Sequence, residues 1–330
     1  MYIPHTYPIA LLMMLISMLC WGSWANTEKI DKAWRFELYY WDYMWGILGC
    51  ALLFGLTMGR TNPAAPVSFF RNLSSANARA LIEAFAGGAI FNLGNLLLVA
   101  AISTAGMAVA FPVGAGLALV IGAILNYVVS PAGNPVFLFG GVLLVCAAVA
   151  ANALAYRGLS QGTKAGTKGI VLSLLCGVVI GLFYPFVAKA LIGKGHLGPY
   201  TVCFVFALGA LASNFPLNYA LMRHPLNGPR LSITDYFRGK LRAHVWGISG
   251  GLIWGIGTIC SFVAAYTPMV GPATSFSIGE GNTMISAVWG VFVWKEFHGA
   301  SGKVRRLLAL MFVLFVLGLV SISLAPVFGK

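Results

Sequence analysis

Charged residues are what this sequence has least of. Only 9% of its 330 residues are charged, whereas an average soluble domain has about 25%, and 59% are hydrophobic. So few charges cannot cover the surface of a soluble domain of this length, so a soluble fold is excluded. Apolar runs of about 20 residues, each long enough to cross a ~30 Å hydrocarbon core, recur along the whole chain. The composition therefore predicts an all-α, multi-pass integral membrane protein.

Cysteine pairs and a basic N-terminal segment are also missing. The six cysteines lie in apolar stretches and none forms a CxxC pair, so we expect neither a metal site nor a disulfide framework. No Lys or Arg precedes the first apolar run, whereas a secretory signal begins with a basic region. We therefore expect this run to be retained as a helix. We expect no cofactor, and a proton gradient as the driving force.

Ten segments are expected to cross the membrane. They cover residues 7–26, 36–58, 77–103, 105–129, 134–156, 168–190, 198–222, 243–266, 269–294 and 304–325. The loops after the odd-numbered spans hold most of the 21 Lys and Arg residues. Basic loops of this kind mark the cytoplasmic side, which favours both termini outside the inner (plasma) membrane. The net charge of +13 therefore reflects membrane orientation and does not indicate nucleic-acid binding.

The two halves of the chain resemble each other. Residues 87–101 (GGAIFNLGNLLLVAA) align with residues 250–264 (GGLIWGIGTICSFVA), and FPVGAG at 111–116 aligns with FSIGEG at 276–281. The two offsets, 163 and 165, are nearly equal. We expect a five-helix repeat over 1–156, a connecting loop at 157–167 and a second five-helix repeat over 168–330. Because five is odd, the repeats must be inverted, an arrangement that places a central site at their interface.

The ninth span ends in Val-Trp-Lys-Glu-Phe before a basic turn and an apolar last helix. This ending and the five-plus-five arrangement resemble the drug/metabolite transporter superfamily, whose members often end that helix in an apolar-Gly-Glu signature. Here Lys295 replaces the glycine and Glu296 is kept. CWGSWANTEK (20–29) and RFELYYWDY (35–43) look most like the bacterial sugar-uptake permeases (glucose/ribose and rhamnose types) and the plant ureide permeases. The resemblance implies uptake of small neutral polar molecules, often coupled to protons.

Three of the eight acidic residues lie within the predicted spans. A carboxylate inside the bilayer costs at least about 2.5 kcal/mol and usually faces a cavity or a partner. Glu280 lies deep between two glycines, and its repeat equivalent is Ala115. Burial penalises the charged form, which suits a carboxyl that exchanges protons, although a protonated carboxyl joining two helices is the structural alternative.

The other two acids have stronger alternatives. Asp42 lies among aromatic residues, which suits a sugar or ureide but is also typical of an interfacial aromatic belt. Glu83 is four residues from Arg79 near a helix start, so an ion pair explains it nearly as well. The predicted proton-coupling residues are therefore Glu280, Asp42 and Glu83.

Uncharged polar and aromatic side chains at depth are candidates for binding the solute. Asn92 and Asn95 are three apart on one helix face, and an amide both donates and accepts hydrogen bonds, as a neutral polyol or ureide requires. Asparagine also joins membrane helices, which is the interpretation of Asn126 and Asn214. The remaining candidates are Asn282, Trp21, Trp24, Asn26, Trp41, Tyr184 and Trp254.

These features favour a secondary active transporter for proton-coupled uptake of a small neutral polar solute, with a monosaccharide ahead of a ureide, nucleobase or nucleoside. An exporter of amino acids or amphipathic, cationic compounds is the alternative. The segment from Gly247 to Gly251 matches the G-x-S-x-G pattern of hydrolases, but it opens a membrane helix and no histidine lies deep in a span. We therefore expect a transporter rather than an enzyme, with the solute and the lipid bilayer as its partners.

Overall fold

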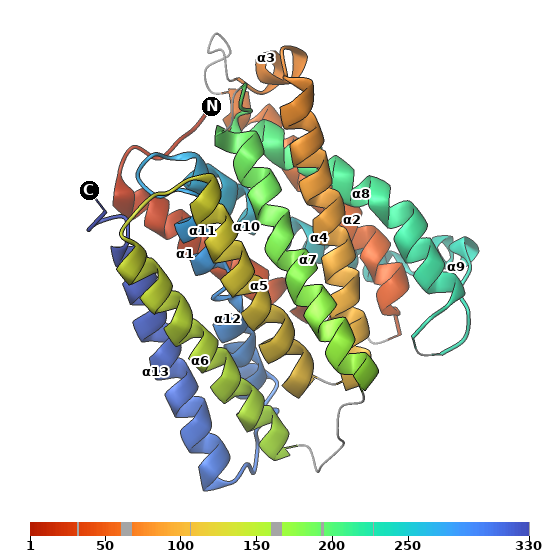
Figure 1. Ribbon diagram of the computed structural model, residues 1–330. Helices are drawn as coiled ribbons and strands as arrows, with labels where there is room; N and C mark the ends of the chain where they lie inside the picture. Colours follow the sequence, from red (N-terminus) through yellow and green to blue (C-terminus); the bar gives the residue numbers. More distant parts are fainter. Residues whose placement is uncertain are drawn as a thin grey trace.

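The computed structural model describes residues 1–329 except 32, 61–67, 106, 160–166, 193–194 and 227. Over these residues all regular secondary structure is helical (Figure 1). Within the described chain, eight segments are long and apolar enough to cross a membrane. They are α1 with two short turns (Tyr7–Ile30), α2 with one (Phe36–Arg60), and α4 (Ala78–Ala105), α6 (Pro135–Leu159), α7 (Thr167–Ile192), α8 (Pro199–Arg223), α10 (Leu241–Tyr266) and α13 (Gly302–Leu324).

Two further apolar segments are shorter. In α5 (Met107–Val129) the qualifying apolar stretch is Val113–Val129. The expected continuous span 269–294 is wrong, because it is divided into α11 (Pro272–Gly279), α12 (Asn282–Val288) and a wide π-helical turn (Trp289–Val293). The chain therefore interrupts one helix where the hydropathy pattern is unbroken.

Local sequence explains where several helices begin. Proline occupies the first position of α6, α8 and α11, where its missing N–H would have no intrahelical partner. The Ser301 hydroxyl accepts a hydrogen bond from the Val304 amide at the start of α13. Two short helices lie in connecting segments, α3 (Phe69–Ser74) and α9 (Ile233–Phe237), and Ser232 with Asp235 caps α9 reciprocally.

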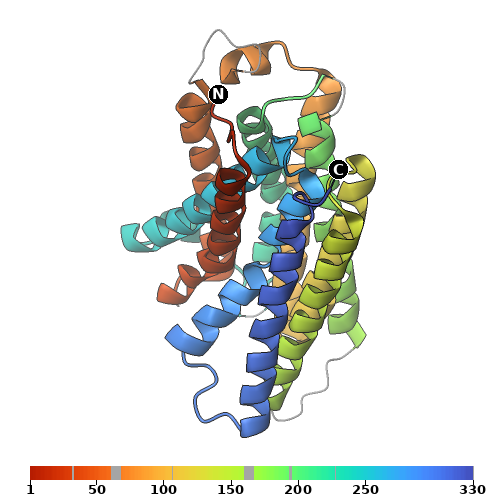
Figure 2. The same ribbon diagram turned by 90° about the vertical axis from the view of Figure 1, so that its left-hand side faces the viewer.

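Both ends of the chain lie at one face of the bundle, toward the top of Figures 1 and 2. The Tyr7 hydroxyl at the start of α1 donates to the Ser323 carbonyl at the end of α13. We call this side the terminal face. At the opposite side, the far face, Lys29 after α1 pairs with Glu296 before α13. The chain therefore crosses the bundle an even number of times.

Glycines allow two pairs of helices to touch backbone to backbone. A Cβ added to Gly46 of α2 would lie 2.3 Å from the Ile248 carbonyl oxygen of α10. A Cβ added to Gly209 of α8 would lie 2.0 Å from the Phe85 carbonyl oxygen of α4. Both approaches are too close for any other residue, so the pairs α2 with α10 and α4 with α8 depend on glycine.

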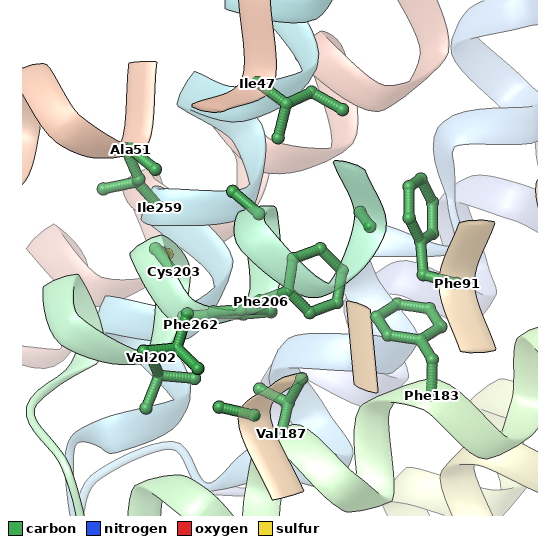
Figure 3. Close-up of a cluster of buried hydrophobic side chains, with 14 of the residues drawn as sticks. Ile47, Ala51, Phe91, Phe183, Val187, Val202, Cys203, Phe206, Ile259 and Phe262 are labelled. Atoms are coloured by element: carbon green, nitrogen blue, oxygen red, sulfur yellow. The ribbon is translucent and has the colours of Figure 1, made fainter. Parts of the chain in front are cut away.

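Two apolar cores flank the centre of the bundle. One joins α2, α4, α7, α8 and α10, and Figure 3 shows its side chains converging on Phe206 and Phe262. Its edge is formed by Phe91 and Phe183, whose ring centroids are 5.6 Å apart. The other core joins α1, α5, α6, α11 and α13. The candidate site lies between the two.

Candidate functional site

The interruption between α11 and α12 falls on Glu280. The preceding residue, Gly279, has no side chain, and a Cβ there would lie 2.7 Å from the Trp21 ring of α1. Glu280 and Gly281 have ψ angles of −10° and −2°, which tighten the turn relative to an α-helix. The Met284 amide then donates to the Gly281 carbonyl at 2.9 Å and resumes the helix. The chain thus makes a short 3₁₀-like turn at Glu280 and Gly281, where the two α-helices meet.

A cavity of about 140 Å³ opens at this turn. That volume is close to the ~150 Å³ of an engineered cavity that binds benzene, so a solute with one small ring fits. Its walls come from α1, α4, α5, α7, α10 and the turn itself. The lining residues are Trp21, Trp24, Ala25, Phe91, Asn95, Leu98, Ala115, Cys176, Ile180, Phe183, Trp254, Glu280, Asn282, Thr283 and Ser286.

The Glu280 side chain lines this cavity. The residue is 8% exposed, and its carboxyl makes no hydrogen bond or ion pair with any residue that the structure describes. No basic side chain is among the residues lining the cavity. Since burying an unpaired carboxylate is costly, the structure favours a carboxyl that takes up a proton or binds the solute.

Aromatic faces form one wall. Trp254 stacks on Phe91 with ring centroids 4.3 Å apart and on Trp21 at 5.8 Å. The Trp21 indole N–H donates to the Thr258 hydroxyl at 3.1 Å, which holds that ring in place. Such faces bind the flat or apolar side of a polar ring.

Amide and hydroxyl groups supply the polar part of the lining. The Asn95 amide donates to the Tyr40 hydroxyl at 3.0 Å, which orients it on α4. Asn282 and Ser286 follow the turn on α12 and are only partly buried, so their polar groups reach the cavity. The cavity therefore offers both donors and acceptors to a neutral solute.

The cavity also brings together the two halves of the sequence alignment. Glu280 and its aligned counterpart Ala115 both line it, from α11–α12 and from α5. Ala115 lies inside a helix that the structure describes as continuous from Met107 to Val129. Among the described residues, only those of the second half combine the acid with the interrupted helix.

Six of the twelve predicted site residues line this cavity and six do not. The lining residues are Glu280, Asn95, Asn282, Trp21, Trp24 and Trp254. Asn92, on the neighbouring part of α4, donates to the Ser213 hydroxyl of α8 at 2.9 Å instead. Tyr184 is buried against Ser261, with their hydroxyls 2.8 Å apart.

Trp41 and Asn26 also make contacts elsewhere. The Trp41 indole N–H points to the sulfur of Met222 on α8 at 3.2 Å. Asn26 accepts from the Trp294 indole at 2.6 Å, near the far face. Trp41 thus packs two helices together, while Asn26 belongs to a polar network considered below.

Asp42 lies in a separate polar cluster near the far face. Its carboxylate contacts His244 Nδ1 at 2.8 Å and accepts from the Tyr236 hydroxyl at 2.7 Å and the Trp34 indole at 3.0 Å. Burial and the adjacent carboxylate raise the pKa of Tyr236, so its hydroxyl stays a donor. This cluster fastens the loop helix α9 to the starts of α2 and α10.

Glu83 lies near the terminal face. Its carboxylate accepts from Arg79 Nε at 3.1 Å, the four-residue pairing anticipated from the sequence. Both line a groove between α4, α5 and α7 that also contains Lys189. Glu83 is therefore an ion-pair partner at the membrane surface.

Sequence reasoning missed several lining residues. Phe91, Phe183 and Ile180 carry no signal beyond hydrophobicity, because any span contains such residues. Cys176 lies in an apolar stretch and is completely buried, so its sequence setting is that of a packing residue. Thr283 and Ser286 could have been found, since they follow Glu280 three and six residues on, near one face of a helix.

A family model described as "Ureide permease" matches residues 39–168 and 155–325. The chain belongs to the ureide permease family. Ureide permease 1 of Arabidopsis thaliana is 25% identical over 96% of both chains. The glucose uptake protein GlcU of Bacillus subtilis (strain 168) is 24% identical over 82% of this chain and 87% of its own. A crystal structure with 15% identity and a TM-score of 0.64 covers 96% of this chain and 98% of that one, and so has the same fold.

These relatives are membrane transporters of small solutes, so this ureide permease family member is a transporter too. The prediction that the chain is not an enzyme is confirmed by the family to which it belongs. The resemblance to the ureide and sugar-uptake permeases is confirmed as well.

Proposed function

We propose that this protein is a secondary carrier of the drug/metabolite transporter type that takes up a small neutral polar ring compound together with a proton. The observation that carries the proposal is the buried, unpartnered Glu280 carboxyl at an interrupted helix inside a cavity lined by aromatic faces and amides. Interrupted helices near the membrane midplane hold the substrate and ion sites of many secondary transporters.

The architecture we infer is a ten-helix inverted repeat, with five crossings in 1–156, a connection at 157–167 and five in 168–330. The helix contacts support it. Gly46 contacts Ile248, and Gly209 contacts Phe85. Positions 46 and 209 are 163 residues apart, and so are positions 85 and 248, so the two contacts are equivalent in the two halves. The same offset recurs in a second pair of contacts, described next.

A Cβ added to Gly251 would lie 2.1 Å from the Tyr43 carbonyl oxygen, and one added to Gly88 would lie 1.9 Å from that of Phe206. Residues 43 and 206, like 88 and 251, are again 163 apart. Two interfaces built on the same register in both halves are what a twofold axis in the membrane plane requires. Exchange of the two repeats around such an axis gives the alternating access of a carrier.

We infer that the far face is cytoplasmic and that both termini lie outside an inner (plasma) membrane. The loops at the far face hold most of the basic residues, including five between Arg223 and Arg242. Short basic loops remain on the cytoplasmic side during insertion.

The polar groups of the cavity suit a neutral solute. One carboxyl, two amides and two hydroxyls line it with aromatic faces, and no basic side chain is present to bind an anion. A planar ureide or nucleobase can stack on the Trp254–Phe91–Trp21 wall while its N–H and C=O groups meet the amides. The family supports a ureide, and similarity to GlcU makes a monosaccharide the second candidate.

Glu280 is the residue we assign to proton coupling. A buried carboxyl binds a proton unless a partner stabilises its charge, and a solute donor is such a partner. Coupling requires that each ligand bias the conformation that the other prefers. Asp42 and Glu83 are engaged by His244 and Arg79, so we place the exchangeable proton on Glu280.

The test is transport into proteoliposomes holding the purified protein, with and without an inward proton gradient. Allantoin, uracil, uridine, glucose and ribose are supplied in turn, with a cationic amphiphile to test the exporter alternative. We expect one of the neutral compounds to accumulate only under the gradient. Accumulation of none of them, or accumulation indifferent to the gradient, would contradict the proposed function.

A further inference from the structure

A second, polar chamber adjoins the Glu280 cavity on the side of the far face. Its volume is about 100 Å³. It shares three lining residues with the cavity, Ala25, Thr283 and Ser286, so the two spaces are neighbours along α1 and α12. Its other lining residues are Gly22, Asn26, Lys29, Asn152, Tyr156, Ala287 and Glu296.

The inside of this chamber holds an unused hydrogen-bonding group. Asn152 of α6 is 7% exposed, and its side-chain oxygen has no hydrogen-bond partner among the described residues. A buried acceptor without a partner costs about 1–3 kcal/mol unless a water molecule or a ligand satisfies it. Ser286, on the shared wall, donates to the Gly22 carbonyl at 3.2 Å. The Asn152 side-chain oxygen can therefore accept a hydrogen bond from a solute in the chamber.

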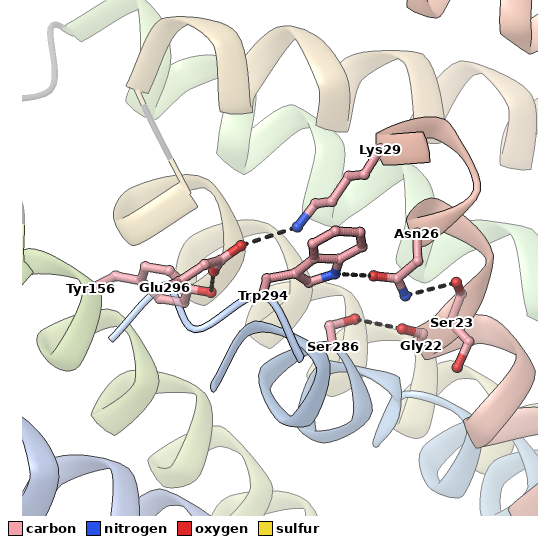
Figure 4. Close-up of polar contacts among 8 residues, drawn as sticks. All are labelled: Gly22, Ser23, Asn26, Lys29, Tyr156, Ser286, Trp294 and Glu296. Carbon is pink, nitrogen blue, oxygen red and sulfur yellow. Dashed lines mark hydrogen bonds and ion pairs between the residues drawn. The ribbon is translucent and has the colours of Figure 1, made fainter. Parts of the chain in front are cut away.

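A cluster of side chains lies at the far-face end of the chamber, and Figure 4 shows its contacts. Lys29 Nζ lies 3.0 Å from one Glu296 carboxylate oxygen, and the Tyr156 hydroxyl donates to the other at 2.9 Å. The Lys29 ammonium also lies 5.2 Å from the centroid of the Trp294 ring, whose indole donates to Asn26. These contacts join three separate segments, the end of α1, the end of α6 and the segment before α13.

The contacts of this cluster are at the surface and hence easily broken. The side chains of Lys29 and Glu296 are 43% and 29% exposed. An exposed ion pair shifts an equilibrium by about fivefold at most. Contacts of this strength can break and re-form without a large energetic cost.

We propose that this chamber is a second binding station for the transported solute, between the Glu280 cavity and the far face, and that the Lys29–Glu296 pair closes its mouth. The inference rests on the proposed function, since it assigns the same neutral polar compound to both spaces. In this account the solute passes from the aromatic wall to the Asn152 oxygen before release. The pair opens when the bundle changes state and re-forms behind the departing solute.

The experiment uses two thiols as reporters in the full-length protein. An Ala115→Cys variant places a thiol in the Glu280 cavity, and an Ala287→Cys variant places one in the chamber alone. Both are labelled by a small, water-soluble thiol reagent, and peptide mass spectrometry measures each site separately, so the native cysteines remain. Labelling is repeated with allantoin and with glucose, and in Glu296→Gln. Arg79→Gln, which breaks an ion pair at the other face, is the matched control.

We expect one of the two compounds to slow labelling of both thiols, and Glu296→Gln to speed labelling at residue 287 about fivefold while Arg79→Gln does not. Exchanging the charges, Lys29→Glu with Glu296→Lys, should restore slow labelling, which a merely misfolded variant would not do. Protection of the thiol at residue 115 alone would overturn the second station and leave the proposed function standing. Protection of neither thiol would overturn both, and unchanged labelling in Glu296→Gln would overturn the closure.

Discussion

The sharpest structural prediction concerns the glycines at which the helices touch. Replacing Gly46 with alanine would put a Cβ 2.3 Å from the Ile248 carbonyl oxygen, and Gly209→Ala would put one 2.0 Å from that of Phe85. Ordinary contacts of this kind exceed about 3 Å, so each pair of helices must separate by close to 1 Å. Overpacking on that scale costs about 1–3 kcal/mol.

Gly49 provides the matched control, because it lies three residues from Gly46 on the same helix and a Cβ there meets nothing within 4 Å. Gly49→Ala should leave stability unchanged or raise it by up to about 1 kcal/mol through helix propensity. The assay is the thermal unfolding midpoint of the detergent-purified protein, followed by size-exclusion chromatography after heating. Gly46→Ala and Gly209→Ala should both lower the midpoint. If either is as stable as Gly49→Ala, the described backbone contact is wrong.

Three further substitutions test other parts of the account. Trp254→Phe keeps an aromatic face but weakens its stack on Phe91. The affinity for the transported solute, measured by calorimetry, should therefore fall about fivefold, or ~1 kcal/mol. Unchanged affinity would remove Trp254 from the site. His244→Ala deprives the buried Asp42 carboxylate of one partner. It should lower the free energy of unfolding by about 1–3 kcal/mol and leave the solute affinity unchanged. A large loss of affinity would link the Asp42 cluster to the site. Lys295 has a φ of 53°, a left-handed conformation that costs a non-glycine residue about 1 kcal/mol. Lys295→Gly should therefore raise the thermal unfolding midpoint. A lowered midpoint would contradict this.

Much of the fold was predictable because a membrane imposes simple rules. Low charge and long apolar runs predicted a multi-pass helical protein, and the eight long apolar helices agree with eight of the expected spans. The interruption at Glu280 was not predicted, because hydropathy averages over a window and a two-residue turn at Glu280 and Gly281 does not change the average. The sequence shows the flanking glycines, but it does not show that Gly279 contacts Trp21, which lies far away in the sequence.

The candidate site was only half predictable for a related reason. Polar residues at depth were correctly identified as unusual, but the sequence does not say which neighbour each one meets. Asn95 and Asn92 are three residues apart, yet one lines the cavity and the other bonds to Ser213 on α8. Asp42 finds its partners in a loop helix and in α10, about 200 residues away. Such pairings depend on how the helices pack, which composition and periodicity leave open.

We propose that the Glu280 carboxyl couples solute movement to a proton. The most direct test compares wild-type protein with Glu280→Gln in proteoliposomes, measuring two activities for the same solute. One is accumulation against its gradient driven by a proton gradient, and the other is exchange of internal for external solute without one. Glutamine is close to glutamate in size but cannot release a proton, so we predict that accumulation is abolished while exchange persists. Undiminished proton-driven accumulation by Glu280→Gln would contradict the account.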